Sequence, residues 1–134
     1  MLEILAIDHI VLRTTKSPEM LDFYTKVLGC TVERKTPEET GLTQLRAGNA
    51  LIDLVVVNSR LGAIGGGAPT KTERNVDHFC LQINSMPEIE IKNYLESHGV
   101  LVGDFESRYG AQGLGNSVYI QDPESNGVEL RCSI

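Results

Sequence analysis

The sequence predicts an α+β fold in which a module of one strand, one helix and three further strands occurs twice. An Asp-His pair that opens an apolar strand recurs 69 positions later, as Asp8-His9 and Asp77-His78. A Pro-Glu pair that opens a helix recurs at the same interval, as Pro18-Glu19 and Pro87-Glu88. Each copy is followed by three short runs of β-type residues. Self-similarity at a fixed interval indicates duplicated supersecondary units.

The chain has 134 residues, of which 41% are hydrophobic and 22% charged. These values are typical of one soluble globular domain with a core of its own. We therefore expect a single domain over residues 1–134. Its first module covers about residues 5–58, a linker about 59–74, and the second module about 75–134.

In the first module, residues 7–13 read as a strand and residues 17–28 as a helix that starts at Ser17-Pro18-Glu19. A proline just inside a helix start loses no hydrogen bond, and Gly29 supplies a stop. Strands are expected at residues 31–34, 42–47 and 50–58. Gly48-Asn49 is a hairpin signal between the last two strands.

In the second module we expect a strand at residues 76–82 and a helix at residues 86–98, which Gly99 ends. Three strands should follow, at residues 101–105, 117–121 and 127–132. Between the modules, residues 62–69 contain four glycines and a proline. This composition predicts a flexible connector in place of a strand or helix.

Charge and cysteine content exclude several classes of function. The net charge of −6 leaves no basic stripe for nucleic acid, and no apolar run approaches the roughly 20 residues that span a membrane. The first residues do not resemble a signal peptide, so a cytoplasmic protein with a small-molecule partner is expected. The cysteines lack CxxC spacing and are interpreted as reduced core residues: Cys30, Cys80 and Cys132.

Two histidines and two acids occupy equivalent places in the modules. Side chains alternate along a strand, which turns His9 and His78 away from the helical layer. Asp53 and Glu129 lie in the last strand of each module, between apolar neighbours. A buried carboxylate is costly unless it is paired or bound to metal, and imidazole with carboxylate suits a divalent transition metal. Considered alone, each of these four residues is interpreted as an ordinary hydrogen-bonded or solvated side chain. The same interpretation applies to His98 at a helix end.

Longer motifs resemble a known family. They are the Asp-His strand starts, the helix end Phe23-Tyr24-Thr25-Lys26-Val27-Leu28-Gly29, and the closing pattern Asp-Pro-x-x-Asn-x-x-Glu over residues 122–129. Together they resemble the vicinal oxygen chelate superfamily of glyoxalases, bleomycin-resistance proteins and extradiol dioxygenases. Residues 108–113 resemble the glyoxalase-domain branch in particular.

The resemblance implies paired βαβββ modules that form a cupped mixed β-sheet around a metal. It assigns His9, His78 and Glu129 as ligands, and Asp53 as a fourth ligand where glyoxalase I has Glu. It also implies substrate binding by Arg13 and Arg108. Two further departures are Val57, where glyoxalase I offers Asn to glutathione, and Ser125, where the terminal turn usually has Gly.

The leading hypothesis is a divalent-metal-dependent, glyoxalase-like lyase or isomerase that acts on a small oxygen-rich or thiol-adduct substrate. Glu129 or Asp53 would serve as its base. The alternatives are an extradiol-type dioxygenase, a thiol transferase, and a metal-free protein that sequesters drugs. Zinc, nickel, manganese, cobalt and iron all remain open as the metal. A symmetric homodimer is expected from the resemblance.

Overall fold

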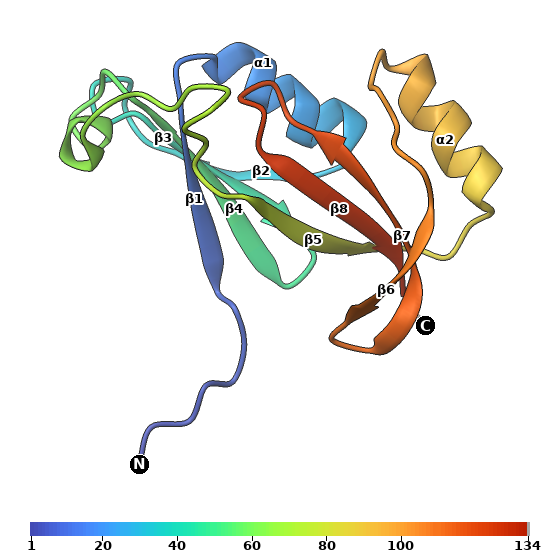
Figure 1. The fold of residues 1–134 in the computed structure, drawn as a ribbon. Helices are drawn as coiled ribbons and strands as arrows, with labels where there is room; N and C mark the ends of the chain where they lie inside the picture. The colour runs from blue at the N-terminus through green and yellow to red at the C-terminus, as the bar shows by residue number, and fades with distance from the viewer. Residues whose placement is uncertain (134) are drawn as a thin grey trace. The chain divides into compact units, whose positions relative to one another are not determined.

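The computed structural model describes residues 1–133, which belong to two compact units divided between Asn75 and Val76 (Figure 1). Each unit contains one four-stranded mixed sheet and follows the order strand, helix, strand, strand, strand. The predicted α+β class and the two βαβββ modules are therefore confirmed. No helix within residues 1–133 is long and apolar enough to cross a membrane.

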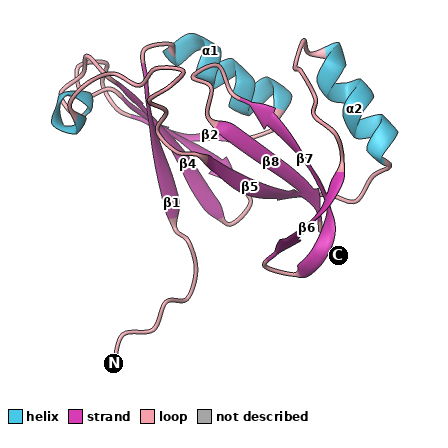
Figure 2. Ribbon diagram, viewed as in Figure 1, coloured by secondary structure: helices cyan, strands magenta, loops and turns pink. Residues whose placement is uncertain are grey.

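The first unit contains four strands in the sheet order β1-β4-β3-β2. Figure 2 draws the strands in magenta and the helices in cyan. Strand β1 runs parallel to β4, and the other neighbours are antiparallel. The elements are β1 (His9–Thr14), α1 (Ser17–Asp22), η1 (Phe23–Val27), β2 (Thr31–Lys35), β3 (Leu42–Ala47) and β4 (Ala50–Val56).

The helix of the first unit packs on the face of the sheet opposite to His9. Helix α1 contacts β4 and continues into the π-helical turn η1, which buries Phe23 and Tyr24. Leu12 and Leu54, on the helix side of their strands, are almost completely buried. Gly29 has a φ of +80° and ends the helical segment, as its position predicted.

The second unit repeats this plan with the sheet order β5-β8-β7-β6. Strand β5 is parallel to β8, and the other pairs are antiparallel. Helix α2 ends in a Schellman motif, in which Gly99 and Val100 donate to the carbonyls of Glu96 and Leu95. The elements are β5 (His78–Ile83), α2 (Glu88–Ser97), β6 (Glu106–Gly110), β7 (Gly113–Gln121) and β8 (Gly127–Cys132).

The strand expected at residues 101–105 is wrong. Those residues have no regular structure, and β6 begins at Glu106. A tight hairpin sets the true position, because Gly110 pairs with Gly113, whose φ is +97°. Gly113 adopts this backbone conformation easily, so the Gly-Ala-Gln-Gly sequence is the turn signal that decides where β6 lies.

The flexible connector expected at residues 62–69 is wrong in part. It contains a short 3₁₀ helix, η2 (Gly62–Gly65), and the guanidinium of Arg13 donates to the carbonyls of Gly62, Gly66 and Gly67. A Cβ at Gly62 would collide with the carbonyl of Val56. The glycines therefore permit close backbone packing in this segment.

The turn between β7 and β8 is organised by the buried carboxylate of Asp122. Its Oδ1 accepts bonds from the backbone N–H groups of Glu124 and Asn126, both at 2.9 Å, and its Oδ2 accepts the side-chain amide of Asn126 at 2.9 Å. Ser125 sits in this turn with a φ of 67°. The turn fixes where β8, and with it Glu129, begins.

We expect Asp122→Ala to lower the free energy of unfolding by about 2–4 kcal/mol, because it leaves buried N–H groups without an acceptor. Asp122→Asn keeps one acceptor oxygen and should lose less than half of that amount. Ser125→Gly is the matched control in the same turn and should change stability by less than about 1 kcal/mol. Urea denaturation measures all three variants. An alanine variant as stable as the wild type would contradict this role for Asp122.

Candidate metal centre

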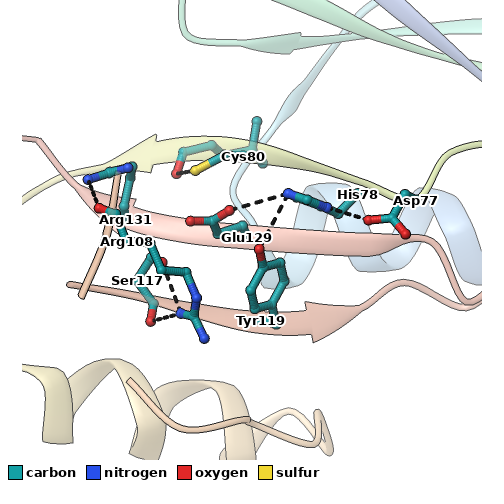
Figure 3. Close-up of polar contacts among 9 residues, drawn as sticks. Asp77, His78, Cys80, Arg108, Ser117, Tyr119, Glu129 and Arg131 are labelled. Carbon is teal, nitrogen blue, oxygen red and sulfur yellow. Dashed lines mark hydrogen bonds and ion pairs between the residues drawn. The ribbon is translucent and has the colours of Figure 1, made fainter. Parts of the chain in front are cut away.

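In the second unit, His78 and Glu129 lie on one face of the sheet. His78 opens β5, and Glu129 stands in β8 opposite Cys80, two residues further along. The imidazole Nε2 lies 3.5 Å from Oε1 of Glu129 (Figure 3). The Glu129 side chain is only 8% exposed. The parallel pairing of first and last strands thus brings together the two residues that the sequence motifs single out.

The His78 ring is oriented by its sequence neighbour. Its Nδ1 lies 2.6 Å from Oδ2 of Asp77. An ionised carboxylate can only accept a hydrogen bond, so Nδ1 carries the proton and the neutral ring keeps its lone pair on Nε2. Metal-binding histidines are commonly oriented in this way by a carboxylate. The free lone pair of His78 is therefore on the nitrogen that faces Glu129.

Tyr119 completes this cluster from the neighbouring strand β7. It is the register partner of Glu129, and its hydroxyl lies 3.4 Å from Nε2 of His78. Partial burial and the Glu129 carboxylate, to which it is hydrogen-bonded, raise the pKa of Tyr119, so the hydroxyl stays protonated and donates. The guanidinium of Arg108 lies 4.5 Å from the centre of the Tyr119 ring, a cation–π contact (Figure 3).

The first unit repeats this arrangement. His9 opens β1, and Asp53 lies two residues further along β4, opposite Val11. Asp53 is 3% exposed, and the amide of Gln44 on β3 donates to both of its oxygens, at 3.3 and 3.2 Å. Nδ1 of His9 lies 2.6 Å from Asp8. This hydrogen bond raises the pKa of His9 against a lowering by burial, and the charge of Asp53 adds to the rise.

Each unit therefore holds one histidine, one carboxylate and one donor on three adjacent strands. The donors Gln44 and Tyr119 are absent from the sequence predictions because no motif marks them. The register would have found Gln44, since the Gly48-Asn49 turn pairs Ala47 with Ala50 and hence Gln44 with Asp53. To predict that Tyr119 lies opposite Glu129, one must also know the length of the turn at Asp122, which joins β7 to β8. Each of these residues donates a hydrogen bond to the acid of its unit, Gln44 to Asp53 and Tyr119 to Glu129.

The His78 and Glu129 pair fits a divalent metal. Two acceptors, the Nε2 lone pair and the carboxylate, face each other at 3.5 Å. Ligand bonds of about 2.0–2.2 Å in a tetrahedral site place neighbouring donor atoms roughly 3.4 Å apart. Within residues 1–133, however, no group of three or more His, Cys, Asp or Glu side chains is placed to hold an ion.

The guanidinium N–H groups of Arg13 donate hydrogen bonds within the first unit. Its Nε and Nη2 donate to Gly62 at 3.2 and 2.8 Å, Nη2 also to Gly66 at 2.7 Å, and Nη1 to Gly67 at 2.8 Å. These bonds give Arg13 a role in holding the glycine loop. Substrate binding by Arg13 stays a prediction, and it requires a substrate anion to replace these carbonyls.

Arg108 lies on the Glu129 side of the second sheet. It donates to the carbonyl and hydroxyl of Ser117, at 2.5 and 3.0 Å, and to Glu106 at 3.2 Å. Its side chain is 22% exposed, so part of it faces solvent beside Tyr119. Substrate binding by Arg108 stays a prediction, with which this placement is compatible.

The three cysteines are free thiols, as expected from their spacing. Cys30 is buried, but the interpretation of Cys80 as a core residue is wrong, because the residue is exposed. Its thiol lies beside Glu129, and partial burial together with that carboxylate raises the pKa of Cys80 to about 11. A thiol that stays protonated at neutral pH is a weak nucleophile and a weak ligand.

His98, interpreted from the sequence as an ordinary residue at a helix end, is exposed and is the C-cap of α2. A surface depression of about 460 Å³ also lies in the first unit, lined by Glu38, Glu39, Val56, Asn58 and Ser59. None of these lining residues belongs to the predicted site. The depression is lined by two exposed acids and no basic residue, whereas Nε2 of His78 lies beside the buried carboxylate of Glu129.

Comparison with known proteins places the chain in a family. The family model of the Glyoxalase/Bleomycin resistance protein/Dioxygenase superfamily matches residues 6–130. A search of curated proteins finds no match. A protein from the mobile metagenome of V. pseudocholerae is 25% identical with a TM-score of 0.82, and the match covers 100% of this chain and 98% of that one.

Two further solved structures show the range of the family. A lactoylglutathione lyase from Agrobacterium tumefaciens is 26% identical with a TM-score of 0.70, over 98% of this chain and 96% of that one. An antibiotic-binding protein from Streptomyces shares the fold at 17% identity and a TM-score of 0.67, over 100% of both chains. Together with the family match, the repeated βαβββ units show that this chain belongs to the Glyoxalase/Bleomycin resistance protein/Dioxygenase superfamily.

Proposed function

We propose that this chain is a divalent-metal-dependent enzyme of the glyoxalase type, a lyase or isomerase that acts on a small oxygen-rich or thiol-adduct substrate. The observation that carries the proposal is the doubled arrangement of an oriented histidine beside a buried carboxylate. His78 lies 3.5 Å from Glu129, and its Nδ1 is held by Asp77 at 2.6 Å. His9 is held by Asp8 at the same 2.6 Å distance.

The four proposed ligands are His9, Asp53, His78 and Glu129. Zinc, nickel, manganese, cobalt and iron are all compatible with this set of imidazole and carboxylate donors. When bound, the ion supplies Lewis-acid polarisation of a substrate oxygen. The Nε2 of each ring is the nitrogen available for ligation, because Nδ1–H donates its hydrogen bond to the neighbouring aspartate.

The carboxylates of Asp53 and Glu129 are the candidate bases. Either acid can take a proton from one substrate carbon and return it to the next, the step that an isomerase of this kind requires. Gln44 holds the Asp53 carboxylate through both oxygens, and Tyr119 donates to Glu129. These contacts fix the direction of each acid, so that proton transfer does not depend on a freely rotating side chain.

The similarity of this chain to a lactoylglutathione lyase, at 26% identity, supports a thiol-adduct substrate. Extradiol-type dioxygenase and thiol-transferase activity are the enzymatic alternatives within the same site. Metal-free sequestration of a drug is the alternative outside enzymology, and an antibiotic-binding protein shares the fold. The proposal further places the protein in the cytoplasm as a homodimer, and a metal requirement separates it from the sequestering alternative.

Metal content tests the ligand assignment. Protein purified without chelator should hold one divalent ion per chain by elemental analysis, and His78→Ala should reduce this content well below one while the circular-dichroism spectrum stays folded. His98→Ala is the matched control, because His98 is exposed at the end of α2. Full occupancy in the His78 variant, or an equal loss in the His98 variant, would remove His78 from the ligand set.

The role of Asp53 separates a catalytic base from a structural acid. Asp53→Asn is nearly the same size and leaves three ligands, so most of the metal should remain. The amide cannot accept a proton, and the rate of hemithioacetal isomerisation should fall by at least about 100-fold. Asp53→Glu restores the residue usual in glyoxalase I and should preserve or raise that rate.

Bound metal is measured on the same Asp53 samples. An asparagine variant that keeps both its metal and a rate within a few-fold of wild type would show that Asp53 does not transfer the proton. In that case the buried carboxylate would serve only to hold the strands through Gln44.

A further inference from the structure

Strand β8 carries a buried cation two residues beyond Glu129. Arg131 is only 6% exposed, and it lies on the same face of the second sheet as Glu129, because side chains two apart on a strand share a face (Figure 3). Its register partners on the neighbouring strands are Gln82 on β5 and Ser117 on β7. A buried charge is costly unless a group of opposite charge compensates it.

Glycines of the β6–β7 hairpin make room for the Arg131 guanidinium. Its Nη2 donates to the backbone carbonyls of Arg108 and Gly113, at 3.2 and 3.0 Å. A Cβ at Gly110 would collide with Nη1, and a Cβ at Gly115 would lie 2.9 Å from Nη2. The guanidinium therefore occupies space that exists only because these two positions have no side chain.

The charge of Arg131 lacks a carboxylate partner within residues 1–133. No Asp or Glu oxygen of these residues lies within 4.0 Å of its guanidinium nitrogens, whereas the guanidinium of Arg108 is paired with Glu106 at 3.2 Å. Nη2 makes both hydrogen bonds of Arg131, and Nε and Nη1 donate to no group in the described chain. Since no buried side-chain nitrogen in that part of the chain is without a partner, Nε and Nη1 must reach the surface.

We propose that Arg131 binds a carboxylate group of the substrate through Nε and Nη1. The proposal rests on the proposed function, because it names the class of substrate that the site takes. Residues two apart on a strand are separated by about 7 Å. The carboxylate therefore lies only a few bonds from the substrate atoms beside Glu129, and a small hydroxy acid or oxo acid meets this requirement.

A carboxylate suits the charges of this face better than a phosphate does. Apart from His78, the charged side chains on the four strands of the second sheet are Glu106, Arg108, Glu129 and Arg131. Because Glu106 compensates Arg108, one guanidinium charge is left for a ligand. A phosphate monoester carries about 1.5 to 2 negative charges at pH 7, and its second charge would be repelled by Glu129.

The test is an NMR titration of the nitrogen-15-labelled full chain as purified, which follows the Nε–H signals of the arginine side chains. The probes are D-lactate and its neutral amide, lactamide, which has nearly the same size. We expect lactate to shift the Nε–H signal of Arg131. Lactate should also bind at least about 10-fold more tightly than lactamide, because the amide cannot accept a charge-assisted hydrogen bond of the same strength.

Three variants locate the effect. Arg131→Met should weaken lactate binding at least about 10-fold. Gly110→Ala keeps the arginine but places a Cβ where Nη1 lies, so it should weaken lactate binding as well. Arg46→Met is the matched control, since it removes an arginine that is paired with Glu33 in the first unit, and it should bind lactate as the wild type does. Thermal melting shows which variants are folded, and the glycine variant decides if the Arg131 variant is not.

Equal affinity of the wild type for lactate and lactamide would overturn the carboxylate site. Lactate binding that persists in folded Arg131→Met or Gly110→Ala would overturn it too, as would an equal loss in Arg46→Met, because overall charge would then explain the effect. Inorganic phosphate that binds at Arg131 more tightly than lactate would overturn the substrate class.

Metal content is measured on the same wild-type samples, so that the two proposals can fail separately. A preference for lactate in a chain that holds no metal would support the carboxylate site and overturn the metal-dependent function. Bound metal without a preference for lactate would overturn the carboxylate site and leave the function standing.

Discussion

The structure depends most on the parallel pairing of the first and last strand in each module. In both units the histidine opens the first strand, and the acid lies two residues further along the last strand. A slip of one residue would turn each acid to the helix side, where Leu54 and Leu130 are buried. Gly127 permits the second pairing, because a Cβ there would lie 2.8 Å from Cβ of His78. The register is therefore what makes a histidine–carboxylate pair out of two distant motifs.

Burial of the acids is tolerated because a neighbour on the third strand satisfies them. Gln44 and Tyr119 do this at equivalent places, yet they differ in chemistry. The amide of Gln44 is neutral and fixed in its role as donor. Tyr119 carries a hydroxyl near Nε2 of His78 and a ring that contacts the Arg108 guanidinium. The two repeated modules thus differ at this place, because only the second presents a hydroxyl and a guanidinium beside its histidine–carboxylate pair.

Much of the fold was accessible from the sequence because the repeat, the helix stops and the hairpin signals are local. Gly29 and Gly99 end their helices with positive φ as expected. The misplaced strand at residues 101–105 shows where local patterns fail, since apolar residues there have no partner strand. Arg13 shows the same limit for function. The alternation of side chains along a strand predicts that Arg13 lies on the same face as His9. Its hydrogen bonds to three loop carbonyls could not be predicted, because they depend on a connector that folds back onto β1.

The pairs of His9 with Asp53 and His78 with Glu129 are the centre of this account, because the proposed metal binding depends on these residues. Nitrogen-15 NMR of the histidine side chains during a zinc titration tests this most directly. The account predicts that the Nε2 signals of His9 and His78 shift together and saturate at one ion per chain, while both Nδ1 atoms stay protonated and His98 is unaffected. An unshifted His9 or His78, or an equal shift of His98, would contradict the proposed ligand set.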